Sequence, residues 1–195
     1  MSNRRAVFLD RDGTLIHDAG YLATPEGVVL LSGVIEALKM LRKHQFTLVL
    51  VSNQSGLGRG LFTHTQHKQV HARVVELLAQ EGISFTGTYY CLHAPWESCD
   101  CRKPRPGLLH RAAAEIGLNL EQSFMVGDKL SDVAAGRRAG CYTVLLRDNQ
   151  TALALDDVAV EESPHFVAPN LCVAAHWIAT SLSIYNVQEE SLHVR

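Results

Sequence analysis

Two aspartates that follow the first apolar run are the residues of this chain best suited to chemistry. Residues 6–9 are apolar, and Asp10, Asp12 and Gly13 come directly after them. In an extended segment, residues two apart point the same way, so both carboxylates could face one ligand. One carboxylate could attack phosphorus while the other acts as general acid and base, and the pair would also suit Mg²⁺. An ordinary turn at a strand end has the same composition, so the motif alone leaves both interpretations open.

Two later segments carry groups that suit phosphate. In VSNQSGLGRG (residues 51–60), Ser52, Asn53 and nearby main-chain N–H groups could cradle phosphate oxygens, and Arg59 adds a cation. In CRKPRPG (residues 101–107), Arg102 could bind a phosphate bidentately and Lys103 could act as a point charge. A flexible glycine loop and a solvated basic loop are the respective structural alternatives.

A third acidic position occurs late in the chain, in MVGDKLSD. Asp128 follows an apolar run and a glycine there, and could complete a Mg²⁺ site with Asp10 and Asp12. For Asp132 in the same segment, the main alternative is a carboxylate at a helix start, stabilised by the helix dipole.

Cysteines and a histidine cluster between residues 91 and 101. Cys91, His93, Cys99 and Cys101 together supply three thiolates and one imidazole, a standard tetrahedral set for zinc. Two tight ligand pairs predict a closed, structural site with one Zn²⁺ per chain. Such a site would brace the adjoining Arg102 and Lys103, whereas unlinked cysteines with a surface histidine are the alternative.

The elements that must position these residues alternate between strand and helix patterns. Apolar runs and helical periodicity predict strands over 6–9, 47–51, 88–91, 124–126, 142–146 and 165–167, and helices over 34–43, 66–80, 106–116, 132–139 and 171–182. This alternation predicts an α/β fold with a mostly parallel sheet and helices on both faces. Ligands of such sheets bind beyond the carboxyl ends of the strands. Asp10, Ser52 and Asp128 all follow strand ends, so one pocket could gather them.

Length, composition and charge set the remaining expectations. The chain has 195 residues, 47% of them hydrophobic and 19% charged, as expected for one domain over 1–184 with a flexible tail over 185–195. A net charge of −2, from 18 basic and 20 acidic residues, argues against nucleic-acid or membrane partners. The N-terminus lacks the apolar stretch of a signal peptide, and no run reaches the roughly 18 apolar residues of a membrane span. We therefore expect a cytoplasmic protein. We also expect it to act as a monomer.

The order of these motifs resembles the haloacid dehalogenase (HAD) superfamily. The resemblance rests on Asp-x-Asp-Gly-Thr after the first strand, Ser-Asn after the second, a lysine before the third helix, and a later Gly-Asp. It implies that Asp10 is the phosphate-accepting nucleophile and Asp12 the acid and base. It also implies that Ser52 and Lys103 hold the phosphoryl group, and that Asp128 binds a catalytic Mg²⁺. The implied fold is a Rossmann-like three-layer sandwich without a large cap domain.

The zinc-bound loop inside this arrangement resembles the branch that contains histidinol phosphatases and heptose-bisphosphate phosphatases. The motifs at 18–21, 53–60 and 102–107 are closer to the heptose-bisphosphate members. That likeness implies removal of the C7 phosphate of a small phosphorylated sugar, heptose 1,7-bisphosphate, through an aspartyl-phosphate, in the synthesis of nucleotide-activated heptose. The substrate contacts that it implies, besides those to the phosphoryl group, are Arg11, Asp18, Ala19, Gly20, Tyr21, Asn53, Gln54, Ser55, Arg59, Arg102 and Lys129.

Two features keep alternatives open. The five-residue spacer between His93 and Cys99 is short, as in histidinol phosphatases, so histidinol phosphate is the second candidate substrate. Ser52 stands where threonine is often found, but it retains the hydroxyl group. A non-catalytic, zinc-braced binding domain on the same fold is the alternative of another class.

Overall fold

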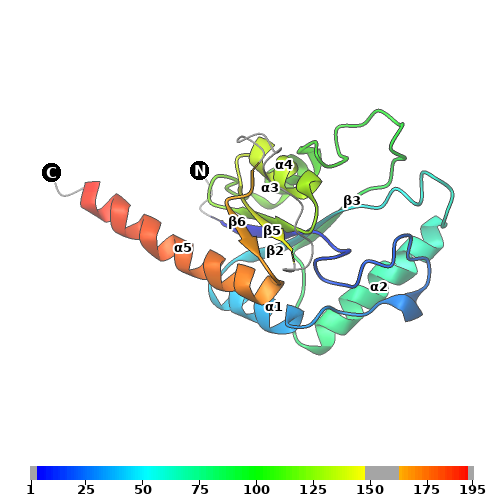
Figure 1. Cartoon of the computed structure of the whole chain (residues 1–195), viewed down its shortest axis with the longest axis horizontal. Coiled ribbons are helices and arrows are strands. Elements are labelled where there is room, and N and C mark those ends of the chain that lie inside the picture. Colours follow the sequence, from blue (N-terminus) through cyan, green and yellow to red (C-terminus); the bar gives the residue numbers. More distant parts are fainter. Residues whose placement is uncertain (1–3, 148–162, 193–195) are drawn as a thin grey trace.

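Six parallel strands form a single sheet in the order β3-β2-β1-β4-β5-β6 (Figure 1). The computed structural model describes residues 4–147 and 163–192, of which 182–192 are described by the main chain only. The strands are β1 (Ala6–Leu9), β2 (Thr47–Asn53), β3 (Gly87–Cys91), β4 (Phe124–Gly127), β5 (Tyr142–Leu146) and β6 (Phe166–Ala168). This sheet confirms the expected Rossmann-like α/β fold.

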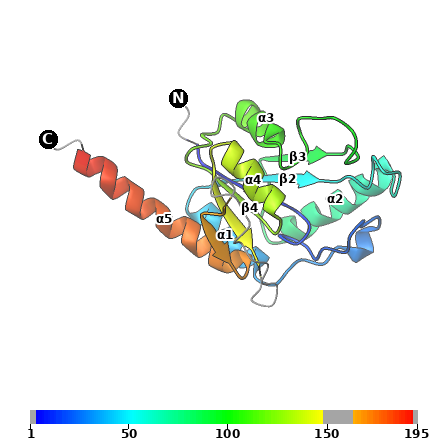
Figure 2. The same cartoon turned by 45° about the horizontal axis from the view of Figure 1, so that its top comes forward.

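Helices cover both faces of the sheet and make three layers (Figures 1 and 2). They are α1 (Val34–Lys43), α2 (His64–Gln80), α3 (Gly107–Ile116), α4 (Leu130–Arg138) and α5 (Leu171–Leu192), with a 3₁₀ turn η1 (Pro25–Gly27) after β1. The side chains of α1, α2 and α5 pack in one apolar cluster, and those of α3 and α4 pack in another. Side chains along β1 alternate between the two clusters: Val7 and Leu9 belong to the first, and Ala6 and Phe8 belong to the second.

Local signals explain where several helices begin and end. Thr63 and Gln66 form a capping box, so α2 begins at His64, two residues before the predicted start. Helix α3 ends at Ile116, because the next residue, Gly117, has a φ of 73° in the left-handed region. Helix α5 continues to Leu192, through most of the segment expected to be a loose tail, and extends away from the body (Figure 2).

The carboxyl edge of the sheet collects the loops that carry the predicted motifs. Asp10 follows β1, the glycine-rich loop follows β2, the cysteine loop follows β3, and Asp128 follows β4. No helix within the described ranges combines the length and the apolar character needed to span a bilayer.

Candidate active site

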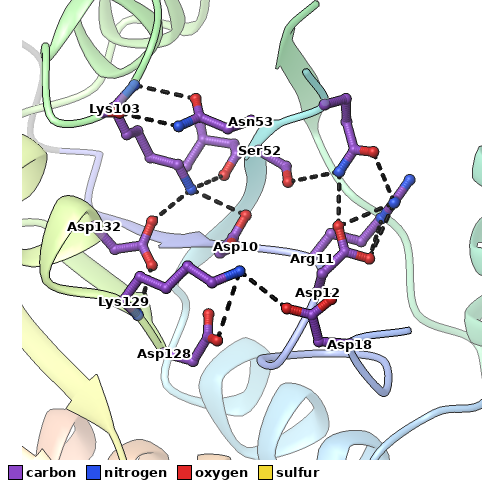
Figure 3. Close-up of polar contacts among 12 residues, drawn as sticks. Asp10, Arg11, Asp12, Asp18, Ser52, Asn53, Lys103, Asp128, Lys129 and Asp132 are labelled. Atoms are coloured by element: carbon purple, nitrogen blue, oxygen red, sulfur yellow. Dashed lines mark hydrogen bonds and ion pairs between the residues drawn. The ribbon is translucent and has the colours of Figure 1, made fainter. Parts of the chain in front are cut away.

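The ends of β1 and β4 bring the Asp10–Asp12 motif close to Asp128, as Figure 3 shows. The Asp10 N–H donates to the Val126 carbonyl at 3.0 Å, so the turn after β1 is tied to the end of β4. Gly13, with a φ of 77°, lies against Asp128, and a Cβ atom there would come within 2.3 Å of Asp128 Oδ2. The glycine is therefore required for the close approach of the two loops.

Lys103 is the buried cation at the centre of the site. Its Nζ lies 2.9 Å from Asp10 Oδ1 and 2.6 Å from Asp132 Oδ1, and donates to the Val51 carbonyl at 2.9 Å (Figure 3). Burial opposes its charge, but the two carboxylates outweigh burial and raise the pKa of Lys103 above its ordinary value. The ammonium group is thus held charged beside Asp10.

Asn53 fixes the main chain that carries this lysine. Its Nδ2 donates to the Lys103 carbonyl at 3.0 Å, and its Oδ1 accepts from the Lys103 N–H at 3.1 Å. Both polar ends of the amide are therefore used by the protein, so Asn53 joins β2 to the loop before α3.

Three carboxylates form a group that could hold a metal ion. Asp10, Asp128 and Asp132 each offer an oxygen, and these oxygens lie within 4.8 Å of one another. Asp128 Oδ1 is buried and has no hydrogen-bond partner among the described residues. Burial raises the pKa of Asp128 to about 7, and the charges of Asp10 and Asp132 add to the effect against that of Lys129. A carboxylate oxygen without a hydrogen-bond partner, beside two other carboxylates, is a donor set that fits a hard cation such as Mg²⁺.

The carboxylate of Asp12 does not join this group, which differs from the metal set expected from the sequence. Arg11 Nη2 donates to both Asp12 oxygens at 3.0 Å, and Gln54 Nε2 donates to Asp12 Oδ2 at 2.7 Å (Figure 3). Burial raises the pKa of Asp12 above its ordinary value, although these partners act against the rise. Asp132, for which a helix-start carboxylate was the main alternative, belongs to the group and also accepts from the Lys129 N–H at 3.0 Å.

Gln54 connects Asp12 to its surroundings. Besides its bond to Asp12, its Nε2 donates to Ser52 Oγ at 3.1 Å, and its Oε1 accepts from Arg11 Nη2 at 2.8 Å. The side chain of Arg11 is 1% exposed. Arg11 and Gln54 were expected to contact the substrate. In the structure, the side chains of both residues are hydrogen-bonded to other protein groups.

The other expected substrate residues form the rim of the site. Lys129 Nζ pairs with Asp18 Oδ2 at 3.0 Å and lies 3.9 Å from Asp128 Oδ2. The Arg59 guanidinium carbon lies 5.8 Å from the ring centre of Tyr21 and 5.4 Å from that of Trp96. Three loops thus meet at Arg59. They are the loop 18–21, which contains Ala19 and Gly20, the loop that contains Ser55 and Arg59, and the cysteine loop.

Arg102 contributes a cation on the cysteine-loop side. Its Nη1 is buried and has no partner among the described residues. It lines a groove of about 560 Å³ together with Trp96, Ser98, Arg105 and Arg138. Arg102 thus belongs to the basic lining of this groove, and a guanidinium can bind an anion.

The four predicted zinc ligands converge: Cys91 ends β3, and the other three lie in the irregular loop that follows it. Cys91 Sγ lies 3.8 Å from Cys99 Sγ and 3.6 Å from His93 Nδ1, and Cys101 Sγ lies 3.3 Å from the same nitrogen. A tetrahedral zinc with ordinary bond lengths separates its ligand atoms by about 3.8 Å for two sulfurs and about 3.6 Å for sulfur and nitrogen. The four side chains therefore fit a zinc ion.

Comparison with protein families and curated proteins finds related hydrolases. Residues 100–174 match the HAD-hydrolase-like family. Over 147 residues the chain is 44% identical to the D-glycero-beta-D-manno-heptose-1,7-bisphosphate 7-phosphatase of Helicobacter pylori (strain ATCC 700392 / 26695), which covers 75% of this chain and 85% of the relative. The enzyme of the same name from Escherichia coli (strain K12) is 37% identical over 186 residues, covering 91% and 90%.

The solved structures agree with the sequence relatives. The D,D-heptose 1,7-bisphosphate phosphatase of B. bronchiseptica, complexed with magnesium and phosphate, superposes with a TM-score of 0.81 at 30% identity. The match covers 91% of this chain and 99% of that structure. A HAD-like phosphatase from Mesorhizobium loti gives a TM-score of 0.78 at 32% identity and covers 91% of this chain and 87% of its own.

Proposed function

Because the chain belongs to the HAD-like hydrolase family and is a phosphatase, we propose that it hydrolyses the C7 phosphate ester of D-glycero-D-manno-heptose 1,7-bisphosphate. The observation that carries the proposal is the similarity to the Helicobacter pylori relative, whose name specifies this substrate and position. The proximity of Asp10, Lys103 and Asp128 at one edge of the sheet supports it.

In the first step, the Asp10 carboxylate attacks phosphorus. The new bond joins Asp10 to the phosphoryl group, and the bond from phosphorus to the sugar C7 oxygen breaks. Asp12, protonated at the start, donates its proton to the departing alkoxide. Burial, which raises the pKa of Asp12, favours the protonated form that this step needs.

In the second step, the Asp12 carboxylate removes a proton from water, which attacks the phosphorus of the aspartyl-phosphate. The Asp10–phosphorus bond breaks, inorganic phosphate is released, and Asp12 is protonated again. Lys103 supports both steps, because its ammonium group neutralises negative charge beside Asp10. The Ser52 hydroxyl would hold a phosphoryl oxygen.

Mg²⁺ would be held by Asp10 and Asp128. Asp132 already accepts from Lys103 and from the Lys129 N–H, and the Asp12 carboxylate is engaged by Arg11 and Gln54, which leaves Asp12 only its main-chain carbonyl to offer. When bound, the ion would neutralise charge on the transferring phosphoryl group. Zn²⁺, bound by the cysteine loop, would have a structural role.

The second phosphate of the substrate needs its own cations. Arg102, which lines the groove beside the cysteine loop, and Lys129, which pairs with Asp18, are the candidates. The remaining rim residues, Asp18–Tyr21 with Ser55 and Arg59, would surround the sugar. We further propose that the protein acts as a monomer in the cytoplasm and that residues 1–184 form one domain. Sedimentation of the purified chain would test the oligomeric state.

Steady-state kinetics on two purified substrates test the proposed function. We expect a higher kcat/KM for the heptose 1,7-bisphosphate than for histidinol phosphate, with Mg²⁺ required for both. A clear preference for histidinol phosphate would overturn the substrate assignment. No Mg²⁺-dependent phosphate release from any ester of a broad panel would favour a non-catalytic role.

A further inference from the structure

Gln54 is a buried residue that contacts both Asp12 and Ser52. It is the first residue after β2, and it is 5% exposed. Its main-chain N–H donates to the carbonyl of Cys91, the last residue of β3, at 2.7 Å. The start of the glycine-rich loop is therefore fixed on the neighbouring strand. From this fixed point the side chain reaches the loop after β1, where its amide contacts Arg11 and Asp12.

The orientation of the Gln54 amide is determined by Arg11. A guanidinium can only donate hydrogen bonds, so the amide atom that meets Arg11 Nη2 at 2.8 Å must be the oxygen Oε1. The nitrogen Nε2 then points to Asp12 Oδ2, at 2.7 Å, and to Ser52 Oγ, at 3.1 Å. A turned amide would place its oxygen against the Asp12 carboxylate and its nitrogen against the guanidinium, and both contacts would be repulsive. The charged partners thus fix which end of the amide faces Ser52.

Both hydrogens of Gln54 Nε2 are engaged by the protein. An amide nitrogen carries two hydrogens, and it has two acceptors here, Asp12 Oδ2 and Ser52 Oγ. The side chain therefore keeps no donor for a substrate. Arg11 also binds Asp12 but, in the part of the chain that the structure describes, it has no bond to Ser52. Gln54 is thus the residue that connects Asp12 to Ser52.

The same bond determines what the Ser52 hydroxyl can donate. Ser52 Oγ accepts from Gln54, so the hydroxyl proton is not used in that bond. Within residues 4–147 and 163–192, this is the one hydrogen bond that the structure gives to Ser52 Oγ. The hydroxyl proton remains available to a phosphoryl oxygen, as the role proposed for Ser52 requires.

We propose that Gln54 is a positioning residue, and not a substrate contact, which holds the Asp12 carboxylate and the Ser52 hydroxyl in one fixed arrangement. Both bonds start from the same nitrogen, so a shift of either group disturbs the other. The role rests on the proposed function, in which Asp12 exchanges the proton while Ser52 holds an oxygen of the same phosphoryl group. Gln54 touches no substrate atom, so its effect is on the alignment of the reacting groups.

Steady-state kinetics of Q54M test the proposal. Methionine has a similar length and fills the same space, but it has no hydrogen-bond donor. We expect kcat to fall about 10-fold with KM changed less than about twofold, because alignment is lost while the substrate contacts remain. Q69M, on the exposed face of α2, is the matched control and should keep wild-type values. A kcat close to wild type in Q54M, or a rise in KM that exceeds the fall in kcat, would overturn the proposal.

A double-mutant cycle with Ser52 separates positioning from a general loosening of the fold. We expect S52A and Q54M each to lower kcat, and the double variant to lose less than the product of the two single losses, because Gln54 acts partly through Ser52. A defect elsewhere in the fold would make the two losses independent. A double variant that shows the full product would therefore contradict the positioning role.

A measurement on the wild-type chain covers a folding failure of Q54M. In ¹H–¹⁵N spectra without substrate, we expect both side-chain amide protons of Gln54 to exchange with solvent at least about 10-fold more slowly than those of Gln69. Equal exchange rates at the two glutamines would overturn the proposal. If the heptose bisphosphate is not hydrolysed, kcat is compared on p-nitrophenyl phosphate, so a wrong substrate and a wrong role for Gln54 give different results.

Discussion

Lys103 Nζ and Asp132 Oδ1 are 2.6 Å apart, and the two side chains are only 1% and 2% exposed. Asp132 lies in the first turn of α4, where its Oδ2 also accepts from the Lys129 N–H. The helix thus holds the carboxylate, and the carboxylate holds the ammonium group of Lys103 toward Asp10. This pair connects the fold of α4 to the charge of the candidate nucleophile.

Loss of that ammonium group should harm both stability and activity. K103M leaves Asp10 and Asp132 buried without their cation, a change that costs about 3–5 kcal/mol in comparable buried pairs. We expect urea denaturation to show a loss of this size, with no detectable turnover. The control K39M removes an exposed ion pair with Glu81 and should change stability by about 0–1 kcal/mol. Equal effects of the two variants would contradict a structural role for the buried pair.

Replacement of the nucleophile should separate folding from catalysis. In D10N an amide of nearly the same shape replaces the nucleophilic carboxylate. The amide cannot form the acyl-phosphate, so we expect kcat to fall at least ~10³-fold. The circular dichroism spectrum should match that of the wild type. Turnover close to wild type in D10N would exclude the aspartyl-phosphate mechanism.

The zinc site can be tested by metal analysis of protein purified without chelator. We expect one equivalent of zinc per chain, and less in C99S because one of four ligands is lost. C99S should also melt at a lower temperature, since the loop from Cys91 to Cys101 loses its brace. The matched control is C172S, as Cys172 lies on α5, away from this loop, and is not a disulfide partner. Zinc-free wild-type protein with freely alkylated thiols would refute the site.

Local patterns were sufficient to predict the frame of the site. Helical periodicity over 34–43 and the apolar run over 142–146 match α1 and β5 at both ends. Since parallel strands end at one edge, Asp10 and Asp128 could be placed together without any contact information. The spacing of the cysteine loop was equally informative, because metal ligands must be close regardless of the loop conformation.

Pairings between polar side chains could not be predicted in the same way. Lys103, in a loop without periodicity, pairs with Asp132 on α4, and Gln54, in the loop after β2, bonds to Asp12, in the loop after β1. Such contacts depend on how the loops meet in three dimensions, and a single sequence carries no signal for them. The burial of Arg11, next to two expected catalytic aspartates, is the clearest example.

The rim arginine should affect substrate binding more than chemistry. The Arg59 guanidinium contacts the rings of Tyr21 and Trp96, so R59M keeps part of the packing but removes the cation. We expect KM to rise several-fold, about 1 kcal/mol of binding, with a smaller change in kcat. R73M, which removes an exposed arginine on α2, is the control. A fall in kcat at unchanged KM would place Arg59 in the chemistry instead.

The buried state of His67 predicts how stability depends on pH. Burial lowers the pKa of His67 to about 4 in the folded chain, against about 6.5 in an unfolded chain. Between these values the unfolded state binds the extra proton, so the stability that neutral His67 contributes is complete above pH 6.5 and is lost as the pH falls toward 4. Each unit of pKa difference corresponds to about 1.4 kcal/mol, and we expect a total loss of about 1–3 kcal/mol.

Urea titrations at several pH values should therefore show that the wild type loses more stability than H67F from pH 7 to pH 4. The comparison removes the contribution of carboxylates that titrate in both proteins, and H44Q, at the exposed end of α1, serves as the histidine control. Parallel stability curves for wild type and H67F would show that His67 is not held neutral by the fold.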